Sequence, residues 1–575
     1  MLSRKEFDLL RDVYEGKSIN SNEHINTLIS NGYIDSSLNI TTEGFNQLNS
    51  HKVDNAIILA AGMSTRFVPV SYEKPKGLIA VKGEVLIERI IRQLQEKNVK
   101  EIVIVVGYMM EKFLYLREKY GATLVVNNEF ATKNTHSSIY HARKHLGNTY
   151  ICCSDNYYPE NPFHEYEYKA FYCSIFLEGI SYVERAFTFD ENDLIYDTNK
   201  PSNNQWIMYG HAYYDKEFTK NFVPILEDYY GRDGVENLYW ENVYAQNLDK
   251  LPMYIKRCED GEILEFDSME ELKVFDPDFI THNKIKIFEN ICNILNCKNS
   301  DIKDIEVIKK GLNNRSFKFL CKDKEYVYRH PGNVADGIID RVKEASSLKV
   351  AKSLGIDKTL VYVDEIEGWK ISNFINTTEE FDFHNFKHLT LLSDTLKKLH
   401  SANIQVGFEF DYPSEAQKLL HTIKTLDNNS YNSLKTTEEK MQPIINYLKN
   451  NPWQKSLCHN DIYEPNLLVS DNRLDLIDWE FAGDSDIGYD ICKLFSLNCP
   501  NFDDCDEYLK LYFKRNTSEE EKLHLFACAS VIYYYWFVWA IYESKNDSKS
   551  SSYMMGWYDK MNHYANIVLK YIKGA

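Results

Sequence analysis

The chain has 575 residues, which predicts three or four domains of about 150 residues rather than a single one. It carries 85 acidic and 66 basic residues, and the net charge of −19 repels phosphate backbones, which disfavours general nucleic-acid binding. Its twelve cysteines include no C-x-x-C pair, so we expect reduced thiols in a cytoplasmic protein rather than disulfides or a zinc site.

The N-terminal residues 1–52 predict a small domain. Residues 4–15 and 23–31 have apolar positions at helical spacing, residues 33–40 are typical of a short hairpin, and Thr42 can cap a further helix. Charged residues begin at once, so no secretion signal is indicated.

Two helices and a small hairpin resemble a winged helix-turn-helix, whose function would be DNA binding. The first fifty residues carry four basic and seven acidic side chains, a balance of −3. Because a DNA reader should be basic, we favour a regulatory or dimerising appendage, with DNA binding as the open alternative.

A buried strand and a loop suited to phosphates come next. Residues 56–60 are continuously apolar, which is typical of a parallel strand covered on both faces. Small residues then let the backbone approach an anion, and two cations follow them. The candidate nucleotide-binding and catalytic residues of this stretch are Ala60, Gly62, Ser64, Arg66 and Lys76.

This stretch resembles the sugar-nucleotide pyrophosphorylase fold, and most closely the CTP:phosphocholine cytidylyltransferases. The resemblance implies that Arg66 holds the β and γ phosphates of CTP and that Lys76 stabilises charge at the α phosphorus. The family pattern is G-x-G-x-R, and Ser64 replaces its second glycine here.

Alternating elements over residues 53–280 predict an α/β domain with a doubly wound, mostly parallel sheet. Helices are expected over 86–97 and 110–120, and strands over 101–106 and 149–154. The last strand delivers Asp155 to the carboxyl edge of the sheet, where ligands bind, and we predict it as a metal ligand.

The resemblance also implies further site residues. Asn134 matches a family segment of the nucleotide pocket. For a second metal ligand two acids compete: Glu241 stands where relatives commonly carry Asp, and Asp267 lies in a separate family signature.

Aromatic residues of this domain offer a binding box for a quaternary ammonium group, since such cations bind ring faces. The candidates are Trp206, Tyr209 and Trp240. Taken singly, each ring is more typical of core packing than of a cation box.

Residues 281–575 predict an α+β, protein-kinase-like domain. A hairpin from Val307 through a polar Asn313-Asn314 turn to Cys321 resembles the nucleotide-covering loop of the choline kinase family. Arg329 then takes the place of the usual kinase lysine. Glu344 can pair with Arg329 as the strand lysine and helix glutamate do in kinases, or it is a surface acid.

Residues 457–480 contain an H-x-D-x-x-x-x-N motif followed by a short hairpin and Asp478. Phosphoryl transfer needs a carboxylate for the acceptor hydroxyl and oxygen ligands for Mg²⁺, and Asp461, Asn466 and Asp478 fit these tasks. The segment resembles the choline kinase and aminoglycoside phosphotransferase branch. That resemblance implies Asp461 as catalytic base, and Asn466 and Asp478 as Mg²⁺ ligands. Asp490 is expected to cap the next helix.

Residues 525–542 are apolar enough to compare with a membrane span, but their four Tyr and two Trp favour a buried helix, so no span is predicted. Trp536 and Trp539 lie on one helical face and match a W-x-x-W element of choline kinases, with Trp557 or Tyr558 as a further wall for a trimethylammonium group. Core packing is the alternative for these rings.

Together the motifs predict a bifunctional, Mg²⁺-dependent enzyme whose partners are small molecules: choline, phosphocholine, ATP and CTP. One domain phosphorylates choline, and the other joins phosphocholine to CTP. The alternatives are ethanolamine or another amino alcohol as substrate, and a transcriptional regulator that senses metabolites with degenerate domains. A homo-oligomer is compatible with the sequence.

Overall fold

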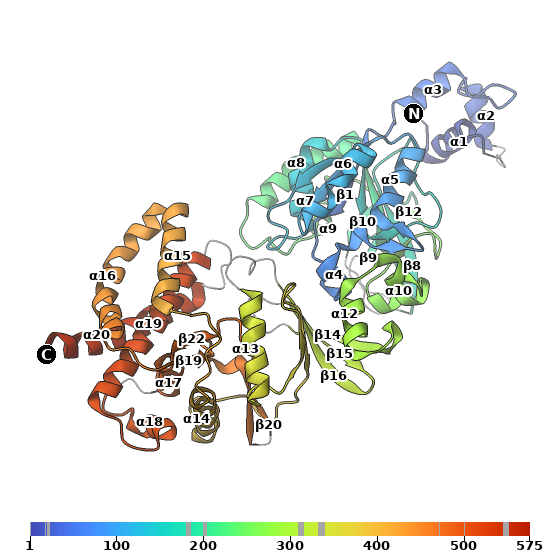
Figure 1. The fold of residues 1–575 in the computed structure, drawn as a ribbon. Helices are drawn as coiled ribbons and strands as arrows, with labels where there is room; N and C mark the ends of the chain where they lie inside the picture. Colours follow the sequence, from blue (N-terminus) through green and yellow to red (C-terminus); the bar gives the residue numbers. More distant parts are fainter. Residues whose placement is uncertain are drawn as a thin grey trace. The chain divides into compact units, whose positions relative to one another are not determined.

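The chain folds into two compact units, Met1–Asn290 and Ile291–Ala575, in this computed structural model (Figure 1). The structure describes residues 2–17, 19, 23–179, 186–198, 204–308, 315–331, 340–470, 472–498, 501–543 and 551–574. The division between the units falls within helix α12 (Lys286–Leu295). The domain boundaries 52/53 and 280/281 stay predictions.

The first unit is built on a sheet of nine described strands in the order β10-β9-β11-β6-β1-β4-β5, with β8 beside β11 and β12 beside β8. Strands β1, β4, β5 and β6 are parallel, whereas β11 is antiparallel to β6, β8 and β9. The expectation of a mostly parallel sheet is therefore wrong, because the strands from β8 onward make it mixed. The bounds are β1 (Asn55–Ala60), β4 (Glu101–Val106), β5 (Thr123–Val126), β6 (Thr149–Cys153), β8 (Phe171–Glu178), β9 (Ala186–Phe189), β10 (Ile195–Thr198), β11 (Asn204–Tyr214) and β12 (Tyr254–Arg257).

Helices cover both faces of this sheet, as the doubly wound prediction requires. Along β1, Ile57 and Leu59 join one core with α7, α8 and α9, while Ile58 and Ala60 join another with α5. Both sides of β1 are buried because successive strand side chains point to opposite faces. The helices are α4 (Val70–Glu73), α5 (Leu86–Glu96), α6 (Tyr115–Tyr120), α7 (Thr135–Ala142), α8 (Lys216–Tyr230), α9 (Trp240–Ala245), α10 (Met269–Phe275) and α11 (Phe279–Asn283).

The N-terminal segment packs against the rest of the first unit, and a buried ion pair joins the two. It contains α1 (Arg4–Tyr14), α2 (Glu23–Ser30) and α3 (Thr42–Asn49), with one bridge, Ile34 to Ile40, in place of a longer hairpin. Thr41, rather than the expected Thr42, caps α3, since its hydroxyl accepts from the N–H of Gly44. Arg11 lies 3.1 Å from Glu167.

The second unit begins with an antiparallel sheet in the order β14-β15-β16-β18-β17. The predicted hairpin is present as β14 and β15, but its turn, including Gly311, Asn313 and Asn314, lies outside the described residues. Helix α13 (Arg341–Ser353) follows. The strands are β14 (Ile302–Ile308), β15 (Arg315–Cys321), β16 (Lys324–His330), β17 (Leu360–Val363) and β18 (Lys370–Asn373).

The rest of the second unit is mainly helical and contains two small hairpin-like sheets. Its helices are α14 (Phe386–Ser401), α15 (Tyr412–Leu426), α16 (Asn428–Asn450), α17 (Gly488–Ile491), α18 (Asp506–Phe513), α19 (Glu519–Glu543) and α20 (Ser551–Gly574). Strand β19 (Lys455–Cys458) pairs with β22 (Gly483–Asp486), and β20 (Leu467–Ser470) pairs with β21 (Arg473–Leu476). Within the described part of the chain, α19 alone has the length and apolar composition of a membrane span, and 83% of its apolar window is buried.

Candidate active sites

The loop after β1 leaves the carboxyl edge of the first sheet beside β6. Leu59 pairs with Cys153, so the loop starts next to the strand that leads to Asp155. Ser64 has φ 50° and ψ 50°, a left-handed conformation that glycine adopts more readily. A Cβ added to Gly62 would meet no atom within 4 Å, so the space on that side of the loop is open to a ligand.

Lys76 and Asp155 meet at this edge. The Lys76 Nζ lies 2.9 Å from the Asp155 Oδ2, and the lysine is only 8% exposed. The next residue, Gly77, explains the close approach: a Cβ there would lie 2.7 Å from the Cβ and Oγ of Ser154. A residue without a side chain at position 77 therefore lets the lysine loop pack on the end of β6.

Arg66 and Asp267 form a second cation–carboxylate pair, at 2.7 Å between Nη1 and Oδ1. Their side chains are 73% and 65% exposed, so water screens the pair and its net contribution to stability is small. Strand β13 (Leu264–Glu265) pairs with β7 (Asn156–Tyr157), and Glu265 lies opposite Asn156. This pairing brings the segment before Asp267 beside the residue after Asp155.

Glu241, the competing candidate, has a different environment. It is 8% exposed and accepts a hydrogen bond of 3.0 Å from the hydroxyl of Tyr172 in the core. Among the described residues, no close cluster of three possible metal ligands contains Asp155, Glu241 or Asp267. Carboxylate oxygens suit a hard cation such as Mg²⁺, and the strand pairing supports Asp155 with Asp267 as its ligands.

Asn134 caps α7. Its side-chain oxygen accepts from the N–H of Thr135, and its amide donates to the carbonyl of Asn237 at 3.4 Å. Its position ties the start of α7 to the segment that leads into α9.

The aromatic box expected from Trp206, Tyr209 and Trp240 is not assembled. Trp240 is 2% exposed and stacks on Tyr172 in the core, with ring centroids 5.4 Å apart. Trp206 instead contacts Phe176 and Phe189, and the Arg257 guanidinium lies 5.6 Å from its ring centroid. Trp240 is thus a core residue, and a cation of the protein itself already lies near Trp206.

In the second unit, Asp490 holds the H-x-D loop by its backbone. Its two carboxylate oxygens accept from the N–H groups of His459 and Asn460, each at 2.9 Å. Burial would raise the pKa of Asp490, but the hydrogen bond with His400 and these contacts outweigh it and lower the pKa. Asp490 lies inside α17, so the prediction that it caps the following helix was wrong. Its side chain binds the backbone of the H-x-D loop instead.

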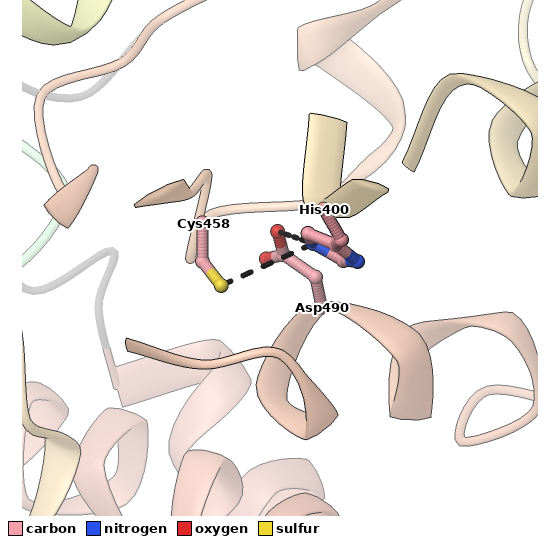
Figure 2. A group of neighbouring side chains, drawn as sticks. All are labelled: His400, Cys458 and Asp490. Atoms are coloured by element: carbon pink, nitrogen blue, oxygen red, sulfur yellow. Dashed lines mark hydrogen bonds and ion pairs between the residues drawn. The ribbon is translucent and has the colours of Figure 1, made fainter. Parts of the chain in front are cut away.

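Figure 2 shows Asp490 beside His400 and Cys458, which come from α17, α14 and β19. The His400 Nε2 lies 3.2 Å from the Asp490 Oδ2 and 3.9 Å from the Cys458 Sγ, and all three residues are buried. The other ring nitrogen of His400 is 2.9 Å from the Tyr512 hydroxyl. These hydrogen bonds already engage the carboxylate and both ring nitrogens, so the cluster is a support for the loop.

Asp461 is half-buried in this loop. Burial, and then the nearby charge of Asp478, raise the pKa of Asp461 to about 7, against opposing effects of Lys493 and Asn466. The Asn466 amide donates to the Asp461 carbonyl at 2.9 Å and to its carboxylate at 3.0 Å, which leaves the amide oxygen for a cation. Asn466 and Asp478 thus offer the oxygen ligands that Mg²⁺ prefers.

The predicted ion pair between Arg329 and Glu344 is present in the core of the second unit. Arg329 lies 2.6 Å from Glu344 and 3.1 Å from Asp478, and the two partners in the first pair are 4% and 1% exposed. Burial would raise the pKa of Glu344, but Arg329 and Lys370 lower it to about 2. Lys370, 3.8 Å from both acids, belongs to this network and has no motif in the sequence that would reveal it.

The three predicted tryptophans of α19 and α20 lie together. Ring centroids are 5.6 Å apart for Trp536 and Trp539, 5.9 Å for Trp536 and Trp557, and 6.4 Å for Trp539 and Trp557. Phe481, three residues after Asp478, contacts Trp536 at 5.6 Å. This tryptophan cluster therefore adjoins the segment that follows the candidate metal ligand.

Two family models match the chain: the MobA-like NTP transferase domain over residues 56–155, and choline/ethanolamine kinase over residues 305–533. The choline-phosphate cytidylyltransferase of Streptococcus pneumoniae is 33% identical over 218 residues, which covers 38% of this chain and 95% of that protein. The 2-aminoethylphosphonate cytidylyltransferase of Lancefieldella rimae is 34% identical over 230 residues, covering 39% and 93%. The crystal structure of choline kinase LicA from Streptococcus pneumoniae aligns at 19% identity and TM-score 0.42, covering 49% and 99%.

These matches fall on the two units that carry the two sites. The chain belongs to the choline-phosphate cytidylyltransferase family and carries, in the same polypeptide, a choline/ethanolamine kinase domain.

Proposed function

We propose that this protein makes CDP-choline in two steps, first phosphorylating choline with ATP and then transferring a cytidylyl group from CTP to phosphocholine with release of pyrophosphate. One observation carries the proposal: a kinase-family domain and a cytidylyltransferase domain, each with its own set of acids and cations, occur in one chain. The product of the first reaction is the substrate of the second.

In the kinase step, Asp461 orients the choline hydroxyl and accepts its proton as the hydroxyl oxygen attacks the γ phosphorus. Arg329, held by Glu344, lies beside Asp478 and supplies positive charge at the nucleotide. Trp536, Trp539 and Trp557 bind the trimethylammonium group, since ring faces attract such cations.

In the transfer step, the loop from Ala60 through Gly62 and Ser64 offers backbone N–H groups to the triphosphate. Arg66 then exchanges its partner Asp267 for the β and γ phosphates, and Lys76 stabilises charge at the α phosphorus. Asn134, at the start of α7, lines the nucleotide pocket.

We propose Mg²⁺ at both sites, held by Asp155 and Asp267 in the transferase and by Asn466 and Asp478 in the kinase. Bound there, the ion neutralises phosphate charge and so favours displacement at phosphorus. The oxygen-only ligand sets support this choice of metal. Glu241 is left out because it is buried against Tyr172.

Separate substitutions test the assignment of two sites. Asp461→Asn should abolish ADP release with choline and ATP, yet keep CDP-choline formation from added phosphocholine and CTP. Asp155→Asn should do the reverse. Each variant is the control for the other, and loss of both activities in either one would contradict the proposal.

The relatives do not decide which compound the transferase activates. Identity to the 2-aminoethylphosphonate enzyme equals identity to the choline-phosphate enzyme within one percentage point. A phosphonate already carries a phosphorus group, so it needs no phosphorylation by a fused kinase before the cytidylyl transfer. That argument favours a phosphorylated amino alcohol, and the tryptophan cluster favours choline over ethanolamine. Turnover measured with choline, ethanolamine and 2-aminoethylphosphonate would decide between them.

We propose that residues 1–52, which have a winged-helix-like order of elements, act as a structural appendage of the transferase rather than as a DNA reader. The buried Arg11–Glu167 pair supports this, because it joins α1 to the transferase through a network in which Arg11 also pairs with Asp8 and Glu167 with Lys256. The matched family models begin at residue 56 and add no support for the regulator alternative. The cytoplasm, which supplies ATP and CTP, is the proposed compartment.

A further inference from the structure

Lys493 is a buried cation of the kinase unit that the mechanism above does not use. It lies in the short helical turn Cys492–Leu494, one turn after Asp490, and is 8% exposed. Among the described residues its ammonium group has no hydrogen bond or ion pair, and its recorded contact is with the ring of Tyr533, whose centroid is 5.5 Å away.

The side chain of Lys493 is largely buried and, in the part of the chain that the structure describes, its ammonium group has no paired carboxylate, which is costly because burial reduces its hydration. Burial lowers the pKa of Lys493, and the charges of Asp461, Glu464 and Asp490 oppose that effect without forming an ion pair. The ring of Tyr533 compensates only in part, since a ring face attracts a cation less strongly than a paired carboxylate does. Among the described residues, no anion is directly paired with this ammonium group, and a ligand can supply one.

The position of Lys493 indicates which anion this is. Lys493 follows Asp490 by one helical turn, and the Asp490 carboxylate binds the N–H groups of His459 and Asn460, directly before Asp461, the residue that receives the acceptor hydroxyl. The charge of Lys493 also acts to lower the pKa of Asp461. Tyr533, its aromatic neighbour, precedes Trp536 of the tryptophan cluster by three residues, so both rings lie on one face of α19. Lys493 thus adjoins both the Asp490 support of the H-x-D loop and the helix α19, which carries Trp536.

The anion that arrives beside Asp461 is the phosphoryl group in transit, and on this basis we propose that Lys493 contacts that group and then the phosphate of the product. This inference rests on the proposed kinase function. In the step, the choline oxygen forms a bond to the γ phosphorus, its proton passes to Asp461, and the bond to the ADP oxygen breaks with its electron pair on ADP. Lys493 keeps its protons and stabilises the negative charge on the phosphoryl oxygens.

Lys560 of α20 provides a matched comparison. Its Nζ lies 5.3 Å from the centroid of the same Tyr533 ring, but its charge acts with Lys493 and Glu464 and not with Asp461. A substitution there removes the same charge from the same ring while leaving the surroundings of Asp461 unchanged.

The test measures choline kinase activity of the full chain without CTP, in Lys493→Met, Lys493→Arg and Lys560→Met variants. Lys493→Met should lower kcat about 100-fold, as loss of a transition-state donor does, with the KM for choline unchanged or lower. The inhibition constant of phosphocholine against choline should rise about tenfold, because a charged hydrogen bond to the product is lost. Lys493→Arg should recover much of kcat, and Lys560→Met should resemble the wild type.

The proposal is wrong if Lys493→Met keeps its kcat, or if kcat falls while choline and phosphocholine weaken together, which would indicate a damaged pocket. Equal loss in the Arg and Met variants would also refute it. The melting temperature of Lys493→Met should equal or exceed that of the wild type, because a largely buried charge has been removed. A wild-type chain that does not phosphorylate choline would refute the proposed function itself, and this role of Lys493 with it.

Discussion

The two sites differ in the exposure of the arginine pair that each contains. At the transferase edge, Arg66 pairs with Asp267 in an exposed position, and Lys76 pairs with Asp155. In the kinase unit, the Arg329–Glu344 pair is buried. The exposed pair costs little to open, whereas the buried pair is fixed by the packing around it.

The difference indicates how each site receives its nucleotide. An incoming triphosphate can replace the carboxylate partner of Arg66, and the released Asp267 is then free to bind a cation. The kinase site needs no such exchange at Arg329, because Glu344 holds the guanidinium whether or not a nucleotide is present. We therefore expect substitutions in the kinase pair to affect stability, and substitutions at the transferase edge to affect ligand binding.

The largest expected effect is that of Arg329→Met on the stability of the second unit. Removing the arginine takes the nearest cation from the buried carboxylate of Glu344 and leaves it Arg341 at 3.3 Å and Lys370 at 3.8 Å. Breaking a buried pair costs about 3–5 kcal/mol. Hydrogen exchange in peptides of β16 would measure the loss. The double variant Arg329→Met, Glu344→Leu should regain most of it, since no uncompensated carboxylate remains; equal destabilisation of both variants would contradict the comparison.

Local patterns predicted the elements that carry the sites. The apolar run 56–60 is β1, the helix expected over 86–97 is α5, and the hairpin before Asp478 is β20 and β21. These succeed because side-chain periodicity and turn residues act within a few positions. Spacing within one motif also placed Asp461 beside Asn466.

Long-range packing was not predictable in this way. The long strand β11 pairs with β6, β8 and β9, and no local pattern fixes that choice of partners. Trp240 has the composition of a cation box but packs in the core, because its helix faces Tyr172 and Phe222. The roles of Asp490 and Lys493 depend on neighbours brought together by folding, and each stands in the sequence as an ordinary charged residue.

The next effect concerns the proposed metal ligands of the transferase edge. Asp267→Asn should lower kcat/KM for CTP about 100-fold. The loss of a carboxylate ligand weakens binding of the Mg²⁺ that neutralises the phosphate charge. Glu241→Gln, which can still accept the hydrogen bond from Tyr172, is the matched control and should change the rate little. Rates measured across a Mg²⁺ titration would separate the two, and a greater loss in Glu241→Gln would reverse the assignment.

The smallest expected effect is that of Arg66→Met on the stability of the first unit. The guanidinium is 73% exposed and paired with an equally accessible carboxylate, so the free energy of unfolding should change by less than about 1 kcal/mol. Hydrogen exchange in peptides of β1 is the measurement, and it parallels the test on Arg329. Affinity for CTP should fall in the same variant, because a donor to the phosphates is lost. A destabilisation as large as that of Arg329→Met would show that the transferase edge is as rigidly built as the kinase site, and the contrast between exchangeable and fixed charges would then fail.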